Sequence, residues 1–156
     1  MDQMRRNTLK AGGGAGLLAL LAAAGIMRPG ELLAADWNKA AFEVKSTQDA
    51  MKVLGAGSPA TSADIILRAA DIAENGAVVP IGVESKIPGT ESIAILVDKN
   101  PNPLAASFSV PAGTEPSVTT RVKLGQTSDV YALVKANGKY YVSKKEIKVT
   151  IGGCGG

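Results

Sequence analysis

The chain has 156 residues, one cysteine, no histidine and a formal net charge of +3 at pH 7. The lack of histidine removes the commonest general base and the commonest metal ligand, which argues against a self-contained hydrolase or metalloenzyme. The small charge, the absence of an arginine cluster and an aromatic content of only 4% argue against nucleic-acid binding.

The first 35 residues have the pattern of an export signal. Arg5 and Arg6 precede a small, apolar run that reaches Met27, and Ala34-Ala35 supply the small residues expected before a cleavage point. The arginine pair further resembles the twin-arginine export motif. We therefore expect residues 1–35 to be a cleaved signal of the twin-arginine type, and the mature protein to be periplasmic.

Two positions depart from the twin-arginine pattern, namely Met4 and Thr8. A general secretory signal is the alternative. A membrane anchor is disfavoured, because the apolar run is rich in glycine and alanine and ends in Arg28-Pro29-Gly30. Cleavage after Ala35 would leave about 121 residues, enough for one compact domain.

Two short helices are predicted at the start of the mature chain. Ser46 and the three residues that follow it form a capping start, and Gly55 ends the helix. A second helix is predicted from Thr61 to Gly76, because apolar residues recur there at helical spacing: Ile65, Ile66, Ala69, Ile72 and Ala73.

From Ala77 onward the apolar residues alternate, which is typical of strands. Pro80 indicates an edge or a bulge in the first strand, and Asn137-Gly138 predicts a type I′ hairpin turn. Strands are expected around residues 79–83, 93–97, 106–110, 118–124, 130–134 and 147–151. The predicted fold over residues 36–151 is mainly β, an immunoglobulin-like β-sandwich preceded by the two short helices.

The last five residues place the only cysteine on a glycine tether: Gly152, Gly153, Cys154, Gly155 and Gly156. Because glycine lacks a Cβ restriction, we expect residues 152–156 to be a flexible arm. Five extended residues span at most about 17 Å, so the thiol can enter a narrow cleft in a partner. An exported chain with one cysteine makes no internal disulfide, so this thiol either pairs between molecules or stays reactive.

The hairpin that leads to this arm is rich in lysine: Lys135, Lys139, Lys144, Lys145 and Lys148, with Glu146 as the one opposing charge on it. Four of them are candidates for electrostatic support of a thiolate on Cys154, namely Lys139, Lys144, Lys145 and Lys148. Salt screens such a field at exposed distances. The alternative interpretation is a solvated strand face that protects an edge from aggregation.

The tail over residues 148–156, together with the twin-arginine-like signal, resembles the SoxY family of the sulfur-oxidation (Sox) system. Residues 74–81 and 120–124 are also similar to segments of that family. The resemblance implies a periplasmic sulfur carrier and not an enzyme, with Cys154 as the covalent attachment point for thiosulfate-derived intermediates. It implies no metal or cofactor for this chain.

The same resemblance implies partners. A SoxZ-like subunit would form a heterodimer with the chain. A haem-containing SoxAX-like enzyme would join thiosulfate oxidatively to the cysteine, and a dimanganese SoxB-like hydrolase would release sulfate. A SoxCD-like dehydrogenase would act where present.

Two other functions compete with the carrier hypothesis. The terminal Gly155-Gly156 is compatible with a ubiquitin-like carrier that uses a C-terminal thiocarboxylate. Its activation needs cytoplasmic ATP, which conflicts with an export signal. An exported structural or adhesive module that dimerises through Cys154 is the second alternative.

Overall fold

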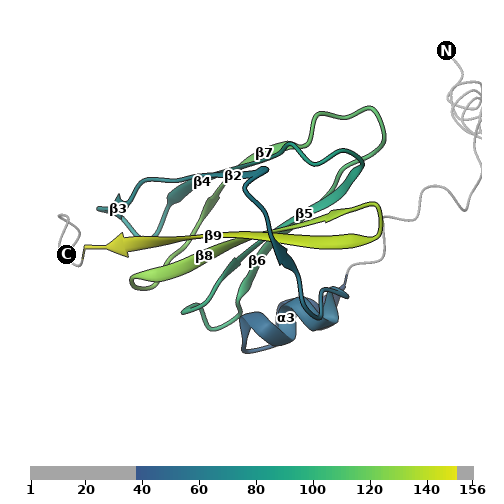
Figure 1. Cartoon of the computed structure of the whole chain (residues 1–156). Helices are drawn as coiled ribbons and strands as arrows, with labels where there is room; N and C mark the ends of the chain where they lie inside the picture. The colour runs from purple at the N-terminus through teal and green to yellow at the C-terminus, as the bar shows by residue number, and fades with distance from the viewer. Residues whose placement is uncertain (1–37, 151–156) are drawn as a thin grey trace, which may run out of the picture. The chain divides into compact units, whose positions relative to one another are not determined.

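The computed structural model describes residues 38–150. The expected signal at residues 1–35 and the expected arm at residues 152–156 lie outside the described residues, so both stay predictions. The described part is mainly β: two sandwich-like sheets with two short helices at its N-terminal end (Figure 1).

Two short helices open the described chain, α2 (Lys39–Glu43) and α3 (Thr47–Val53). The predicted capping start is confirmed, because the Ser46 hydroxyl accepts a hydrogen bond from the Asp49 amide at 3.0 Å. Asn38 caps α2 in the same way through the Ala41 amide, at 3.2 Å. The chain leaves α3 through Gly55, whose φ of 88° favours glycine.

The helix predicted over residues 61–76 is wrong. This segment instead forms two short strands, β2 (Ile65–Arg68) and β3 (Ile72–Ala73). The two-residue strand β1 (Ala60–Thr61) precedes them. β2 pairs antiparallel with β4, and β3 pairs parallel with β9. The β-branched isoleucines suit a pleated, half-buried surface, and pairing with distant strands overrides the local helical spacing. The two short helices are α2 and α3, both upstream of this segment.

The strands lie in two sheets. The larger sheet has the order β1-β9-β8-β5-β6, with β3 also paired to β9, and the smaller sheet has the order β2-β4-β7. The remaining strands are β4 (Val79–Ser85), β5 (Thr90–Val97), β6 (Leu104–Ser109), β7 (Ser117–Val122), β8 (Ser128–Ala136) and β9 (Lys139–Val149). Each of the six regions predicted as strand overlaps one of β4 to β9, and the last region, 147–151, covers only the final three residues of β9.

Two local predictions about turns and edges can be compared with these strands. Asn137 and Gly138 have φ angles of 50° and 70°, which confirms the hairpin turn between β8 and β9. Pro80 lies in β4, the central strand of the smaller sheet, but β2 pairs only with residues 82–85 of that strand. The Ser85 amide donates to the carbonyl of Pro116, so in this antiparallel pairing the odd-numbered amides of β4 face β7 and the Pro80 nitrogen faces the side where β2 has ended. Its missing N–H therefore breaks no ladder.

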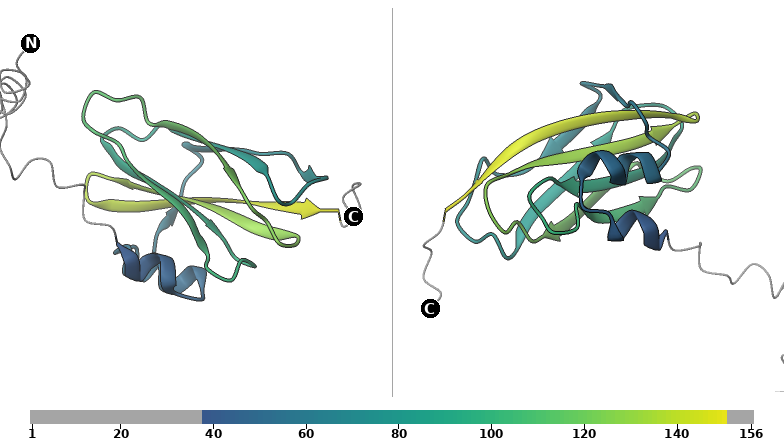
Figure 2. Two further views of the ribbon diagram at one scale, coloured as in Figure 1. Left: turned by 180° about the vertical axis from the view of Figure 1, so that it is seen from behind. Right: turned by 90° about the horizontal axis from the view of Figure 1, so that it is seen from below.

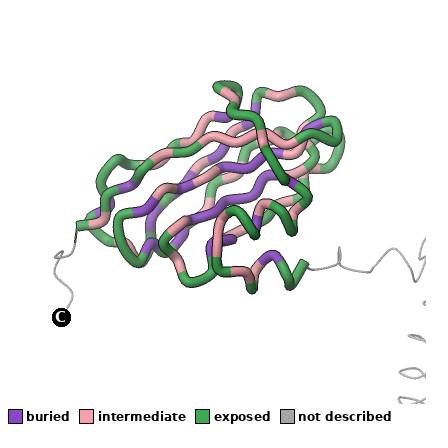
Figure 3. The backbone as a smooth tube through the Cα atoms, turned by 60° about the horizontal axis from the view of Figure 1, so that its bottom comes forward, coloured by how far each residue is buried: buried purple, intermediate pink, exposed green. Residues whose placement is uncertain are grey.

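The core has two parts. Buried side chains of both sheets fill the space between them, with Ile81, Ile93 and Ile147 fully enclosed. A second cluster joins the helices to the outer face of the larger sheet, through Ala50 and Leu133 among others. Figure 2 shows the helices over that face, and Figure 3 shows buried residues along the strand centres with exposed ones in the turns. The helices thus cover part of the outer face of the larger sheet and do not extend over the end of β9.

Candidate functional site

The end of β9 leads toward the candidate attachment residue, so its anchoring decides where the tail begins. β3 runs parallel to it, with Ile72 opposite Lys148. The Lys148 amide donates to the carbonyl of Asp71 at 2.9 Å, and the Thr150 amide donates to the carbonyl of Ala73 at 3.1 Å. The backbone is therefore hydrogen-bonded up to the last described residue, four residues before Cys154.

The opposite side of β9 is held by a side chain. Because successive amides of a strand point to opposite sides, the Val149 amide faces away from β3. It donates to the Thr127 hydroxyl at 3.1 Å. Thr127 directly precedes β8, so its hydroxyl supplies an acceptor just before the first residue of that strand, where β8 itself offers β9 no partner.

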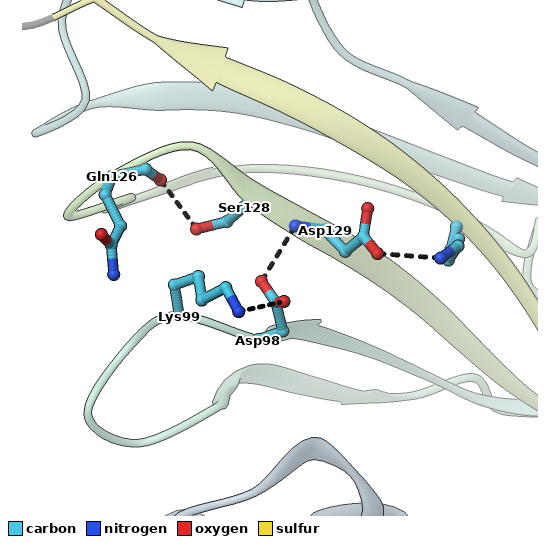
Figure 4. Close-up of polar contacts among 6 residues, drawn as sticks. Asp98, Lys99, Gln126, Ser128 and Asp129 are labelled. Atoms are coloured by element: carbon cyan, nitrogen blue, oxygen red, sulfur yellow. Dashed lines mark hydrogen bonds and ion pairs between the residues drawn. The ribbon is translucent and has the colours of Figure 1, made fainter.

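Figure 4 shows how the start of β8, which follows Thr127, is fixed. The Asp129 amide donates to the Asp98 carboxylate at 2.9 Å, and the Ser128 hydroxyl donates to the carbonyl of Gln126 at 2.7 Å. Lys99 lies 3.5 Å from the same Asp98. These contacts tie the β7–β8 turn to the end of β5, so the Thr127 acceptor is held in place.

The predicted lysines do not form one free positive cluster. Lys135, Lys144 and Lys145 each lie 2.8 Å from a carboxylate on another segment: Glu91, Asp129 and Asp71. Lys139 begins β9 and Val149 ends it, so they are separated by about 33 Å along the strand. Lys148 makes no ion pair with any described residue. Of the four candidates for electrostatic support, only Lys145 and Lys148 lie in the last five residues of β9.

Asp71 carries a negative charge that opposes both of these lysines at the end of β9. It is 86% exposed and lies 2.8 Å from Lys145. The hydrogen bond and charge of Lys145, with a smaller contribution from the charge of Lys148, hold the pKa of the Asp71 carboxyl below its usual value. The local field at the end of β9 is therefore weaker than a count of lysines suggests.

The anchoring residues were missed in the sequence. The residues that fix the end of β9 are Asp71, Ala73 and Thr127. Asp71 and Ala73 fell inside the helix that was wrongly predicted. Thr127 stands in a turn and offers no periodic signal. Only the strand pairing places these residues beside the end of β9.

Within residues 38–150, no group of three or more His, Cys, Asp or Glu side chains is arranged to hold a metal ion. No helix of this region is long and apolar enough to cross a membrane.

Fold and strand end together define a two-sheet β-sandwich protein with two short N-terminal helices. Residues 50–154 match the family model described as sulfur oxidation protein SoxY. Because this match covers more than half of the chain, the chain belongs to the SoxY family of sulfur carrier proteins, and the predicted resemblance is confirmed. Proteins of this family are sulfur carriers that take part in sulfur oxidation, and they are generally not catalytic.

Solved structures agree with this assignment. The sulfur carrier protein SoxY from Chlorobium limicola f thiosulfatophilum is 36% identical, with a TM-score of 0.62, and the match covers 73% of this chain and 100% of that chain. A chain in the structure of T cell activation by the bacterial superantigen toxic shock syndrome toxin-1 is 10% identical, with coverage of 55% and 99% and a TM-score of 0.40. The human F-spondin reeler domain is 12% identical, with coverage of 58% and 93% and a TM-score of 0.33. The last two similarities carry no argument about function. No curated protein sequence matches the chain significantly.

Proposed function

We propose that this chain is a periplasmic sulfur carrier that holds thiosulfate-derived intermediates covalently on Cys154 and delivers them to partner enzymes. The main support is that the family match extends through residue 154. The anchoring of β9 adds to it, because the only cysteine follows four residues after a hydrogen-bonded strand end. Cys154 and the four glycines around it lie outside the described residues.

The first step of the proposed cycle is an oxidation. The Cys154 thiol loses its proton, and its sulfur forms a bond to the sulfane sulfur of thiosulfate. Two electrons leave in this step and pass to the haem-containing SoxAX-like partner. The product is a cysteine S-thiosulfonate with one negative charge.

The second step is a hydrolysis. Water attacks the terminal sulfone sulfur at the dimanganese site of a SoxB-like partner, and the bond between the two outer sulfur atoms breaks. Sulfate leaves, two protons are released, and a persulfide anion stays on Cys154. A SoxCD-like dehydrogenase would oxidise this persulfide where present. Haem and manganese belong to the partners.

A thiol on a short tether suits this cycle. A thiolate forms a bond to sulfur that stays cleavable, whereas a serine alkoxide is far less available and forms no such bond. The tether keeps the intermediate at a high effective concentration near each enzyme in turn. We infer that the chain works as a heterodimer with a SoxZ-like subunit. We also infer that the positive charges of Lys145 and Lys148 favour the thiolate form of Cys154, and that this effect is modest because salt screens exposed charges.

Mass spectrometry of the mature protein tests this function. After incubation with the SoxAX-like enzyme and thiosulfate, we expect a mass adduct that a thiol reductant removes. The adduct should be absent in Cys154→Ser and should form at a reduced rate in Gly153→Ala. Labelled thiosulfate sulfur that never appears on Cys154 would overturn the proposal, and added sulfur on the C-terminal carboxylate would favour the thiocarboxylate alternative.

The export route has its own test. We infer that Arg5 and Arg6 direct the chain to the twin-arginine pathway. Replacing both with lysine should leave the uncleaved precursor in the cytoplasm, because that pathway reads the arginine pair. Normal export of this variant would favour the general secretory alternative, which needs only positive charge.

A further inference from the structure

We propose that an apolar surface beside the end of β9 is where the enzymes that react with Cys154 dock. This surface, the exit patch, consists of Ile72, Ala77 and Val78. The inference rests on the proposed function and adds to it the position of the partner enzyme on the body of the carrier.

The exit patch is unusual in its exposure. In the described part of the chain three large hydrophobic side chains are exposed: Ile72 at 56%, Val78 at 50% and Val53 at 40%. The first two belong to one segment, which runs from β3 to β4, and Ala77 between them is also exposed. Two exposed apolar side chains on one short segment give a docked partner apolar area to bury.

Hydrogen bonds hold this segment in place beside β9. Ile72 lies opposite Lys148 in the parallel pairing. The Ala77 amide donates to the Asn75 side chain at 2.9 Å, and the Leu124 amide donates to the carbonyl of Gly76 at 2.7 Å. Figure 1 shows β3 beside the last part of β9. The exit patch is therefore a preformed surface at the point where the tail begins.

The length of the tail limits where a partner can sit. Cys154 is the fourth residue after Thr150, so their Cα atoms are at most about 14 Å apart in a fully extended chain. An enzyme that brings a reacting group to this sulfur must therefore approach the body of the carrier close to Thr150. On the β8 side of β9, the exposed residues are Gly125, Gln126 and Thr127, which offer little apolar surface. The apolar contact surface lies on the β3 side.

The charges at the rim indicate what the partner presents. Glu74 and Lys148 are exposed, and neither makes an ion pair with a described residue. Asp71 is exposed and already paired with Lys145. A complementary enzyme surface has an apolar centre to cover the exit patch, a basic side chain opposite Glu74 and an acidic side chain opposite Lys148.

A matched set of variants tests the docking surface. The double variant Ile72→Ser with Val78→Ser removes the larger side chains of the exit patch, and Val53→Ser makes the same kind of change at the end of α3. The mature chain, with any co-purifying subunit, is assayed for adduct formation by the SoxAX-like enzyme, and a peptide of residues 148–156 serves as a substrate that lacks the patch. We expect kcat/KM of the double variant to fall about tenfold toward the peptide value, with kcat retained and Val53→Ser unchanged.

The outcomes separate this inference from the proposed function. If the wild-type chain gains no adduct, the proposed function fails. If the wild type reacts and the double variant reacts equally fast, the docking inference is overturned while the function stands. Loss of the co-purifying subunit from the double variant would also overturn it, because the patch would then be a subunit interface.

Two controls guard against trivial effects. Alkylation of Cys154 by N-ethylmaleimide needs no docking, so its rate should be equal in all variants. Circular dichroism should show an unchanged fold. If the double variant does not fold, Val78→Ser alone decides the question, because Val78 lies outside every strand, and a kcat/KM equal to that of the wild type would overturn the inference.

Discussion

Gly76 lies against Val149, the last residue of β9, with no room for a side chain between them. A Cβ atom added at Gly76 would lie 2.8 Å from Cγ1 of Val149 and 2.4 Å from the carbonyl oxygen of Leu124. The Leu124 amide in turn donates to the carbonyl of Gly76 at 2.7 Å. The turn before β4 is therefore packed against the side chain of the last residue of β9 and hydrogen-bonded to the backbone just after β7.

Replacing Gly76 with alanine should destabilise the fold. The new methyl group must displace the backbone at Leu124, since a carbonyl oxygen cannot rotate away as a flexible side chain does. We expect the free energy of unfolding to fall by about 1–3 kcal/mol, measured by urea denaturation. Gly125→Ala is the control, because no atom lies within 4 Å of a Cβ at that position. Equal stability of the two variants would contradict this account of the contact.

Removal of residues 152–156 should leave the fold stable and abolish sulfur loading. The hydrogen bonds found at the end of β9 involve the amides of Lys148, Val149 and Thr150, all of which the truncation keeps. We expect Tm to change by no more than about 1 °C. Removal of residues 149–156 deletes two of these bonds and should lower Tm by about 5 °C. A large loss of Tm in the shorter truncation would show that the tail packs against the body.

Tyr140 ties the helices to the larger sheet, and its hydroxyl should contribute measurably to stability. It donates to the carbonyl of Leu54, just after α3, at 2.5 Å. Tyr140→Phe leaves that carbonyl without this donor, so we expect a loss of about 1 kcal/mol in the free energy of unfolding. Tyr141→Phe is the matched control, because the Tyr141 hydroxyl makes no hydrogen bond within residues 38–150. Losses of similar size in both variants would refute this role of the bond.

The ion pair between Asp71 and Lys145 predicts a pH-dependent contribution to stability. Because Asp71 has a folded-state pKa below its ordinary value of 3.8, its charge stabilises the fold above that pH. The contribution disappears as the pH falls through the lowered pKa. We expect Asp71→Asn to lower Tm slightly at pH 7 and to match the wild type near pH 2.

Added salt should narrow the difference between Asp71→Asn and the wild type at pH 7, since the pair is exposed and screened. Glu115→Gln serves as a control, because Glu115 makes no ion pair with a described residue. A difference between Asp71→Asn and the wild type that persists unchanged at pH 2 would show that the carboxylate charge is not its cause.

Several features of this fold were predictable because they depend on neighbours in the chain. The alternation of Val130, Ala132 and Val134 predicts β8, and Asn137-Gly138 predicts the turn that follows it. The capping start of α3 is equally local. The family resemblance also follows from short motifs, and the match over residues 50–154 confirms it.

Other features depend on contacts between distant segments. The residues 65–73 have apolar spacing that fits a helix, yet pairing with β4 and β9 makes them strands. In sequence the hairpin lysines are opposed only by Glu146, but three of them meet carboxylates that lie on other strands or loops of the folded chain.

The single cysteine, the glycines around it and the alternating strands before it can be read from neighbouring residues, because each is a local property of the chain. The anchoring of the strand before the tail depends instead on contacts between distant segments. Thr127 accepts from the amide of Val149, 22 positions later in the chain, and Ala73 accepts from the amide of Thr150, 77 positions later. Such bonds form when sheets assemble, and no local pattern encodes them. The same assembly pairs Ile72 with the strand end and leaves both Ile72 and Val78 in water.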